Sequence, residues 1–260
     1  MKKFNICFIG AGNVATHLAV ELQKCGHNIT QIYSRTTESA KQLADRLNTD
    51  YSTSNETVTK GADIYIVALK DAVVEQVLSQ LEFDDKLLVH CSGSLPMNIL
   101  SKFSKNYGVF YPMQTFSKSR EVNFKVIPIF VEANSNQNLQ ILEDMANEVS
   151  ESVTVLDSDK RKSLHIAAVF ACNFSNHCYA LAARYLDSKE LPFEILRPLI
   201  METASKVQEL HPKEAQTGPA IRFDENIINA HLNELKEMPG LQELYNSISK
   251  SIFEHHQEKE

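Results

Sequence analysis

Apolar and polar positions along the chain change their spacing near residue 157. Before that point, short apolar runs alternate with segments in which apolar residues recur every three or four positions. The runs are typical of buried strands, and the segments are typical of helices that cover a sheet. This alternation predicts a mostly parallel, doubly wound sheet with helices on both faces, so we expect an α/β domain over residues 1–156.

The expected elements of this domain follow one another closely. The strands are expected at residues 6–9, 28–33, 49–51, 62–69, 86–90, 108–111, 126–131 and 152–156. The helices are expected after the first strand and at residues 38–47, 74–81, 95–103 and 136–149.

The remainder of the chain, residues 157–260, predicts a second domain that is all helical. Residues 160–188 contain no glycine or proline, and from Leu164 to Ala183 they are apolar almost all round, which places this helix inside a bundle. A second helix is expected at 192–210, where Pro198 implies a late start or a kink. A loop at 211–223 and helices at 224–236 and 241–255 complete the expected domain.

A glycine turn joins the first strand to the first helix. The residues are Gly10-Ala11-Gly12-Asn13-Val14-Ala15, a G-x-G-x-x-A pattern. Gly10 permits a tight turn, Gly12 lets a pyrophosphate approach the backbone, and Ala15 lets the helix lie close to the strand. Because the pattern stands between a strand and a helix, it predicts nucleotide binding by Gly10, Gly12, Asn13 and Val14. The alternative is an ordinary turn with two glycines.

The tip of the second expected strand indicates which nucleotide would bind. Ser34, Arg35 and Thr36 stand where an NAD-binding domain has an acidic residue for the ribose hydroxyl. A guanidinium between two hydroxyls suits the 2′-phosphate of NADP instead. The alternative is a solvated arginine beside a helix N-cap.

Two later strand ends are expected to line the same cofactor site, since ligands of such sheets lie beyond the carboxyl ends of the strands. Leu69 and Lys70 follow the strand at 62–69, and Ser92 and Gly93 follow the strand at 86–90. Small polar residues at a strand end can also do no more than turn the chain.

The long helix carries polar residues where it is otherwise apolar. His165 and Asn173 lie on one stripe, eight residues apart. They either form a satisfied core network or face a cleft against the nucleotide domain. Arg222, in the predicted loop, could bind a substrate carboxylate or phosphate, or simply belong to a helix connector whose Asp224 caps the next helix.

Charge and composition argue against several classes of binding partner. The net charge of −7 argues against a nucleic-acid surface. No apolar run reaches the roughly 18 residues of a membrane span, and the N-terminus reads as a first strand, not a signal peptide. Five cysteines without a pattern fit a reducing cytoplasm, and no usual metal site is recognised.

Seven motifs in order give the chain a resemblance to a known family. It resembles two-domain proteins in which a Rossmann-like NADP-binding domain precedes a helical domain called DUF2520, a relative of the 6-phosphogluconate dehydrogenase and pyrroline-5-carboxylate reductase group. The motifs are Phe8 to Ala15, Tyr33 to Thr36, Val67 to Asp71, His90 to Ser94, Tyr111 to Phe116, His165 to Phe174, and Thr217 to Pro219 with Arg222 and Asp224.

The resemblance implies a helical second domain that dimerises, and hydride chemistry with NADP. Differences from the family's sequence pattern limit which residue roles can be carried over to this chain. Hydroxy-acid dehydrogenases of the wider group have a lysine and an asparagine four residues apart on the long helix, but Ile166 stands four residues after Lys162. Tyr111 and Phe223 stand where histidine and glycine are expected in many members.

Two functions of different classes therefore stay open. The first is a reductase in which NADPH serves a small carbonyl or imine bound between the domains. His165 would donate the proton, Asn173 would hold the substrate, and Tyr111 and Arg222 would bind it. The second is a non-catalytic NADP(H)-binding sensor or partner-binding dimer. In both, the helical domain is expected to form a homodimer, because so much of the long helix is apolar.

Overall fold

The computed structural model describes residues 2–258. The chain forms two compact units, one ending at Cys172 and the other beginning at Asn173. We call them the sheet unit and the helical unit, and describe each separately. The domain limit predicted from the sequence, between residues 156 and 157, stays a prediction.

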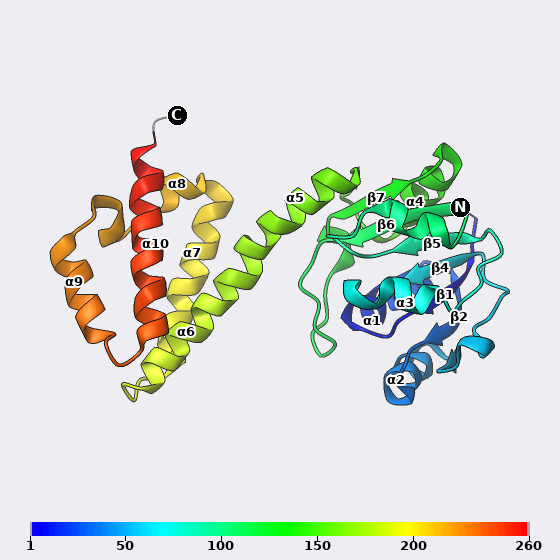
Figure 1. Cartoon of the computed structure of the whole chain (residues 1–260), viewed down its shortest axis with the longest axis horizontal. Coiled ribbons are helices and arrows are strands. Elements are labelled where there is room, and N and C mark those ends of the chain that lie inside the picture. Colours follow the sequence, from blue (N-terminus) through cyan, green and yellow to red (C-terminus); the bar gives the residue numbers. More distant parts are fainter. Residues whose placement is uncertain (1, 259–260) are drawn as a thin grey trace. The chain divides into compact units, whose positions relative to one another are not determined.

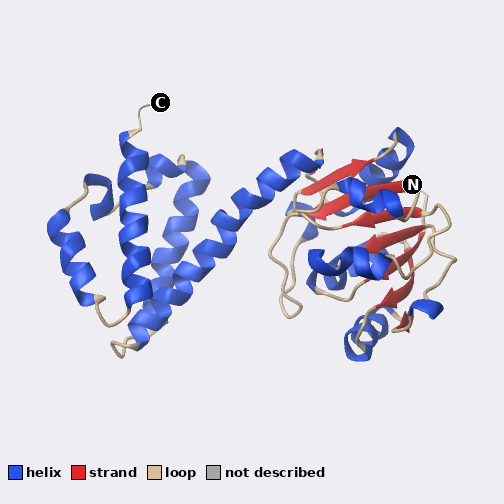
Figure 2. Ribbon diagram, viewed as in Figure 1, coloured by secondary structure: helices blue, strands red, loops and turns tan. Residues whose placement is uncertain are grey.

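The sheet unit is built on eight strands in the order β3-β2-β1-β4-β5-β6-β7-β8 (Figure 2). All neighbouring strands are parallel except β6 and β7, so the expectation of a mostly parallel α/β sheet is confirmed. The strands are β1 (Asn5–Ile9), β2 (Asn28–Tyr33), β3 (Asp50–Ser52), β4 (Ile64–Val67), β5 (Leu87–His90), β6 (Asn106–Pro112), β7 (Ile129–Ala133) and β8 (Val153–Val155).

Helices cover both faces of this sheet (Figure 1). On one face lie α1 (Asn13–Lys24), α2 (Thr37–Leu47) and α4 (Asn136–Val149), and on the other lie α3 (Val74–Leu78) and the 3₁₀ helix η3 (Met97–Lys102). Successive residues of a strand point to opposite faces of the sheet, so a strand that is apolar at every position contributes to both cores. In β1, Ile6 and Phe8 join the first core, and Cys7 and Ile9 join the second.

Several predicted boundaries in this unit are wrong, and two of them show why. The strand expected at 126–131 begins only at Ile129, because Val126 belongs to the 3₁₀ helix η4 (Phe124–Val126) and is 68% exposed. The helix expected at 95–103 is the shorter 3₁₀ helix η3. Both errors arise because apolar composition alone does not set the start of an element.

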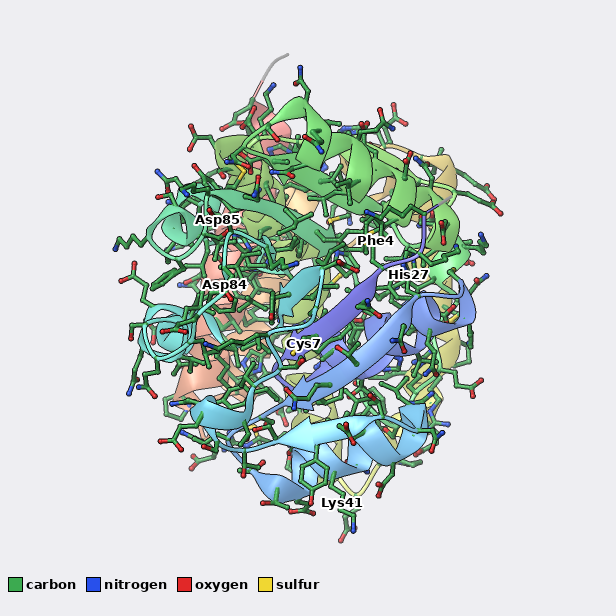
Figure 3. The ribbon with its side chains drawn as sticks, turned by 90° about the vertical axis from the view of Figure 1, so that its right-hand side faces the viewer. Phe4, Cys7, His27, Lys41, Asp84 and Asp85 are labelled. Carbon is green, nitrogen blue, oxygen red and sulfur yellow. The ribbon has the colours of Figure 1, made fainter. Side chains whose placement is uncertain are left out.

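The residue before β1 is tied to the turn between α1 and β2 by a buried histidine. The rings of Phe4 and His27 stack with centroids 5.9 Å apart, and Figure 3 shows the two side chains next to each other, with Cys7 farther along the same strand. His27 Nδ1 accepts a hydrogen bond from the Phe4 amide, 3.3 Å away, and Nε2 lies 3.3 Å from the Glu148 carboxylate. Burial lowers the pKa of His27, against the attraction of Glu148.

The helical unit begins within the long helix, which has three parts. They are α5 (Ser158–Ala168), the π-helix η5 (Val169–Phe174) and α6 (Ser175–Asp187). The expectation of one nearly continuous helix over 160–188 is confirmed, with a π-helical stretch that the sequence did not indicate. The remaining elements are η6 (Phe193–Leu196), α7 (Arg197–Glu209), α8 (Pro212–Ala215), η7 (Pro219–Arg222), α9 (Glu225–Glu234) and α10 (Pro239–Gln257).

Local signals placed these later helices well. Pro198 lies in the first turn of α7, which starts after a 3₁₀ turn, so the predicted late start is confirmed. Asp224 caps α9 by accepting a hydrogen bond from the Ile227 amide, 3.3 Å away. The segment 211–223 is not a plain loop, however, because it contains α8 and η7; His211 caps α8 through its ring nitrogen.

The apolar long helix is not buried within the single chain, which corrects the expectation that it lies inside a bundle. Arg161 is its one buried residue, while Ile166, Phe170 and Phe174 are half exposed or more. By length and composition alone, the helix Ser158–Asp187 could cross a membrane, because an 18-residue window within it has a mean hydropathy of 1.2. Core helices of soluble proteins meet the same criterion.

Candidate cofactor and active site

The turn between β1 and α1 has the geometry that a dinucleotide requires. Gly10 has a φ of +117°, and a Cβ there would lie 2.4 Å from the Ala68 carbonyl oxygen, so the fold itself demands glycine. Gly12 differs, because it has an extended φ of −80° and a Cβ would meet nothing closer than 3.9 Å. Ala15 is fully buried where α1 crosses the sheet.

Gly12 is therefore not required by the packing of the chain, and it leaves open space at the N-terminus of α1. Backbone N–H groups of the first turn have no partner within a helix and carry a partial positive charge. Open space in front of them is what a pyrophosphate needs. The turn thus fits an NADP cofactor on the observed backbone.

The tip of β2 presents a free cation. Ser34 is half-buried and donates its backbone N–H to the Ser52 carbonyl, 3.1 Å away. Arg35 and Thr36 are exposed, and within residues 2–258 the Arg35 guanidinium has no ion-pair partner. Thr36 is the N-cap residue of α2 but makes no capping bond through its side chain. These groups are available to a 2′-phosphate.

The Asn13 side chain holds a neighbouring segment of the fold, and its predicted contact with the cofactor stays a prediction. Its side-chain amide donates to the Phe116 carbonyl, 2.8 Å away, and His17 Nε2 lies 2.9 Å from the Ser117 carbonyl. The His17 and Phe116 rings stack at 5.4 Å. Asn13 and His17 thus fasten the segment after β6 to the first turns of α1, at the edge where the cofactor would lie. The other predicted contacts there, Val14, Leu69 and Lys70, range from half-buried to exposed.

The predicted catalytic histidine meets two of the predicted site residues. His165 Nδ1 lies 3.1 Å from the Tyr111 hydroxyl, and the two rings meet edge to face at 6.2 Å. Gly93 lies beneath both, since a Cβ on Gly93 would be 2.6 Å from His165 Nδ1 and 2.9 Å from Tyr111 Cζ. Three elements of the sheet unit supply this group: the end of β5, the end of β6, and α5.

Ser92 shapes the turn beneath this group. Its hydroxyl accepts hydrogen bonds from the amides of Ser94 and Leu95, at 3.1 and 3.0 Å. Its own amide donates to His90 Nδ1, 3.1 Å away. Ser92 therefore turns the chain, which is one of the two interpretations of the sequence, and Gly93 packs against the Tyr111–His165 pair. The cofactor contact predicted for both residues stays a prediction.

A buried charged residue that the sequence did not indicate lies behind this pair. Arg161 is fully buried, and its guanidinium donates to the Glu132 carboxylate at 2.5 Å and to the Leu95 carbonyl at 2.6 Å. His90, nearby on β5, has its pKa lowered to about 3, mainly by burial and also by Arg161. Arg161 reads in the sequence as one of several charges at a helix start, so its burial had no signal.

Burial also acts on Tyr111. It raises the pKa of the phenol; Arg161 opposes the shift and Cys172 adds to it. The hydroxyl is therefore protonated at neutral pH and can donate a hydrogen bond.

The other two predicted site residues lie in the helical unit. Asn173 is an exposed residue of the π-helix η5, and Arg222 ends the 3₁₀ helix η7. Among residues 2–258, no group of three or more His, Cys, Asp or Glu side chains could hold a metal ion.

Two family models match the chain. One is described as NADP oxidoreductase coenzyme F420-dependent and matches residues 5–93, and the other is the domain of unknown function DUF2520, at residues 127–252. A Bacteroides fragilis protein, named as a candidate NADP oxidoreductase, is 50% identical, and the match covers 97% of this chain and 98% of that one with a TM-score of 0.91. The chain belongs to this family of NADP oxidoreductases with a DUF2520 domain.

More distant solved structures share the fold of the NADP oxidoreductase. A pyrroline-5-carboxylate reductase from Streptococcus pyogenes is 17% identical, with a TM-score of 0.63 over 98% of each chain. An imine reductase from Myxococcus stipitatus, solved with NADP+, is 15% identical, with a TM-score of 0.62 over 96% of this chain and 92% of that one. No match was found among curated proteins.

These matches confirm the resemblance and the fold class predicted from the sequence. The predicted cofactor, NADP, is the one for which the family is named.

Proposed function

We propose that this NADP oxidoreductase is a reductase that uses NADPH on a small carbonyl or imine substrate. The observation that carries the proposal is the Tyr111–His165 hydrogen bond above Gly93, beyond the carboxyl end of β5. Ligands of open parallel sheets bind at this edge. The cofactor, held by the Gly10–Gly12 turn and Arg35, would supply the hydride.

The protein's part in the reaction is to place and deliver a proton. With the Tyr111 hydroxyl donating to His165 Nδ1, the imidazole holds its own proton on Nε2. An Nε2–H on a half-buried ring can be donated to a substrate oxygen or nitrogen that gains negative charge. The Tyr111 hydroxyl proton passes to Nδ1 as the Nε2 proton leaves, so that the imidazole stays neutral, and the phenolate regains a proton from water. Before that transfer the Tyr111 hydroxyl orients the ring from the opposite nitrogen, as the orienting group of a catalytic histidine does.

The substrate contacts are part of the proposal. We assign Asn173 and Arg222 of the helical unit to an interdomain cleft with Tyr111 and His165. An amide and a guanidinium would orient a small polar substrate. Support for an imine or carbonyl comes from the fold shared with an imine reductase and with pyrroline-5-carboxylate reductases.

We also propose that the protein is a cytoplasmic homodimer formed through its helical unit. All five cysteines are free, as in a reducing compartment. The helical unit buries few side chains of its own and exposes large apolar ones, including Leu199 and Met201 at 62% and 64%. An exposed apolar surface of this kind marks an interface.

The reductase is tested by following NADPH oxidation with panels of keto acids, aldehydes and cyclic imines. With a substrate in hand, we expect His165→Ala to lower kcat by about a hundredfold or more, the usual contribution of a general acid. The melting temperature and the affinity for NADPH should change little. His255→Ala, at an exposed histidine of α10, is the matched control.

Tight NADPH binding without turnover on any panel would contradict the reductase. It would favour the alternative, a non-catalytic NADP(H)-binding sensor. If the melting temperature of His165→Ala falls together with its kcat, the histidine is a packing residue.

A further inference from the structure

Arg161 is a buried cation that the proposed chemistry does not use. Its side chain is 1% exposed, and its partners come from three separate segments. One nitrogen donates to Glu132 on β7; another donates to the Leu95 carbonyl after β5, and lies 3.2 Å from the Ser158 hydroxyl on α5. The Ser158 hydroxyl also donates to Glu132, 2.8 Å away. The guanidinium therefore joins α5 to two parts of the sheet edge.

Burying the Arg161 guanidinium has a cost in the free energy of folding. A charge that is moved out of water loses its hydration, and well-packed apolar residues often replace buried ion pairs without loss of stability. Arg161 Nε is moreover buried with no hydrogen-bond partner among residues 2–258. Stability alone therefore does not account well for an arginine here, and orientation is the better explanation.

The element that Arg161 fixes is the one that carries His165. Residues four apart on a helix lie on the same face, so His165 stands one turn beyond Arg161. The ring has little freedom there, because Gly93 lies directly against Nδ1 and the Tyr111 hydroxyl is 3.1 Å away. A shift or rotation of α5 by a fraction of a turn would separate His165 from Tyr111.

The titratable groups that face Arg161 come from three strands. Glu132 on β7 pairs with it directly. His90 on β5 is uncharged at neutral pH, and so is the Tyr111 phenol on β6. The guanidinium opposes protonation of His90, and it partly offsets the rise that burial causes in the pKa of Tyr111.

We propose that Arg161 is a positioning residue, which holds α5 at the height and rotation at which His165 meets Tyr111. The catalytic consequence rests on the proposed reductase function, but the geometric claim does not. Glu132 and Ser158 belong to the same device, since each contacts the guanidinium.

The test measures the hydrogen bond itself in the full-length protein. Histidine ring nitrogens are labelled, and NMR reports which nitrogen of His165 carries the proton; His165→Gln identifies the signals. The variants are Arg161→Met, which removes the charge and the clamp, and Arg161→Lys, which keeps the charge. Glu132→Gln weakens the clamp with almost no change in size. Lys162→Met, at the exposed neighbouring position on α5, is the matched control.

In the parent protein and in Lys162→Met, we expect one ring form of His165, with the proton on Nε2. In Arg161→Met this preference should be lost, and the signals should shift toward those of a free histidine. Arg161→Lys should restore part of the preference, and Glu132→Gln should give an intermediate shift. If Arg161→Met does not fold, the His165 signals of Glu132→Gln provide the test of the proposal.

A melting temperature that falls while the His165 signals stay unchanged, in Arg161→Met or Glu132→Gln, would overturn the proposal and leave Arg161 as a structural clamp. If a substrate is identified, kcat should fall by about tenfold or more in Arg161→Met, with little change in KM for NADPH. If the parent shows no turnover, the reductase proposal fails, while the NMR result still decides the role of Arg161.

Discussion

The two units of this NADP oxidoreductase differ in how far each can bury its own apolar residues. In the sheet unit, both faces of the sheet carry continuous cores, and the central strands β4 and β5 are buried throughout. In the described part of the helical unit, only Ala220, Ile228, Leu235 and Ser249 are buried. Large apolar side chains are correspondingly exposed on α7.

The two units differ in where their stability comes from. A doubly wound sheet satisfies its backbone in the ladder and its side chains in two helical layers, so it is complete within one chain. Helices gain most of their stability from packing an apolar face, and a unit with four buried residues has little of this. The proposed homodimer would supply the missing cover to the helical unit, whereas the sheet unit and its cofactor turn bury their apolar residues within one chain.

Disrupting the helical interface should produce the largest effect. Leu199→Asp places a charge on the exposed apolar surface of α7 and should convert the dimer to a monomer with a less stable helical unit. Light scattering should give about twice 29.3 kDa for the parent and 29.3 kDa for the variant. Val126→Asp, at an equally exposed apolar residue of the sheet unit, should change neither. A monomeric parent at micromolar concentration would contradict the dimer.

Substitutions of the two glycines in the cofactor turn should have different effects, one on the stability of the fold and the other on the affinity for NADPH. Gly10→Ala forces a Cβ against the Ala68 carbonyl at a positive φ, so the free energy of unfolding should fall by about 3 kcal/mol or more. Gly12→Ala has room in the fold, so its stability should stay close to that of the parent. Its affinity for NADPH should nevertheless fall by roughly tenfold or more, because the Cβ occupies space that the pyrophosphate needs. Normal NADPH binding by Gly12→Ala would argue against this site.

Exchanging the charge at the tip of β2 should change cofactor choice without affecting the fold. Arg35→Asp should weaken NADPH binding by about tenfold or more and spare NADH, because it removes a charged partner of the 2′-phosphate. Arg46→Asp, in the last turn of α2, serves as the control for charge alone. Calorimetry on the parent should show preference for NADPH, and equal affinities for both cofactors would remove the argument.

A smaller effect is expected from pH, through the buried His90. The unfolded chain takes up a proton near the ordinary pKa of 6.5, while the folded chain does not until about 3. Stability therefore falls as pH falls through this window, by about 1 kcal/mol from this group between roughly pH 7 and 5.5. Denaturant unfolding at both values should show that His90→Asn loses this part of the pH dependence. An unchanged pH dependence in the variant would exclude His90 as its source.

The sequence predicted the regular parts of the molecule and missed what depends on contacts between distant segments. The strand–turn–helix at Gly10 was predictable because the turn chemistry is local, and Asp224 as a cap was predictable for the same reason. Arg161 was not, because three adjoining charges at the start of α5, Asp159, Lys160 and Lys162, give it the pattern of a solvated turn. Its partners Glu132 and Leu95 are far away in the chain.

The same distinction explains the other differences. Asn13 was predicted from the glycine turn as a cofactor contact, and only the fold shows that its side-chain amide also donates to the Phe116 carbonyl. The long helix was expected inside a bundle because it is apolar all round. Periodicity cannot indicate whether the covering surface comes from the same chain or from another.

The most direct test of the account is a crystal structure of the full-length protein with NADP+ bound. The account predicts the pyrophosphate at Gly12, the 2′-phosphate at Arg35, and nicotinamide C4 within roughly 5–7 Å of His165 Nε2, so that one substrate bond can bridge them. A nicotinamide ring bound away from the Tyr111–His165 pair, with the pair directed into packed protein, would contradict the assignment of this site as the place of reduction.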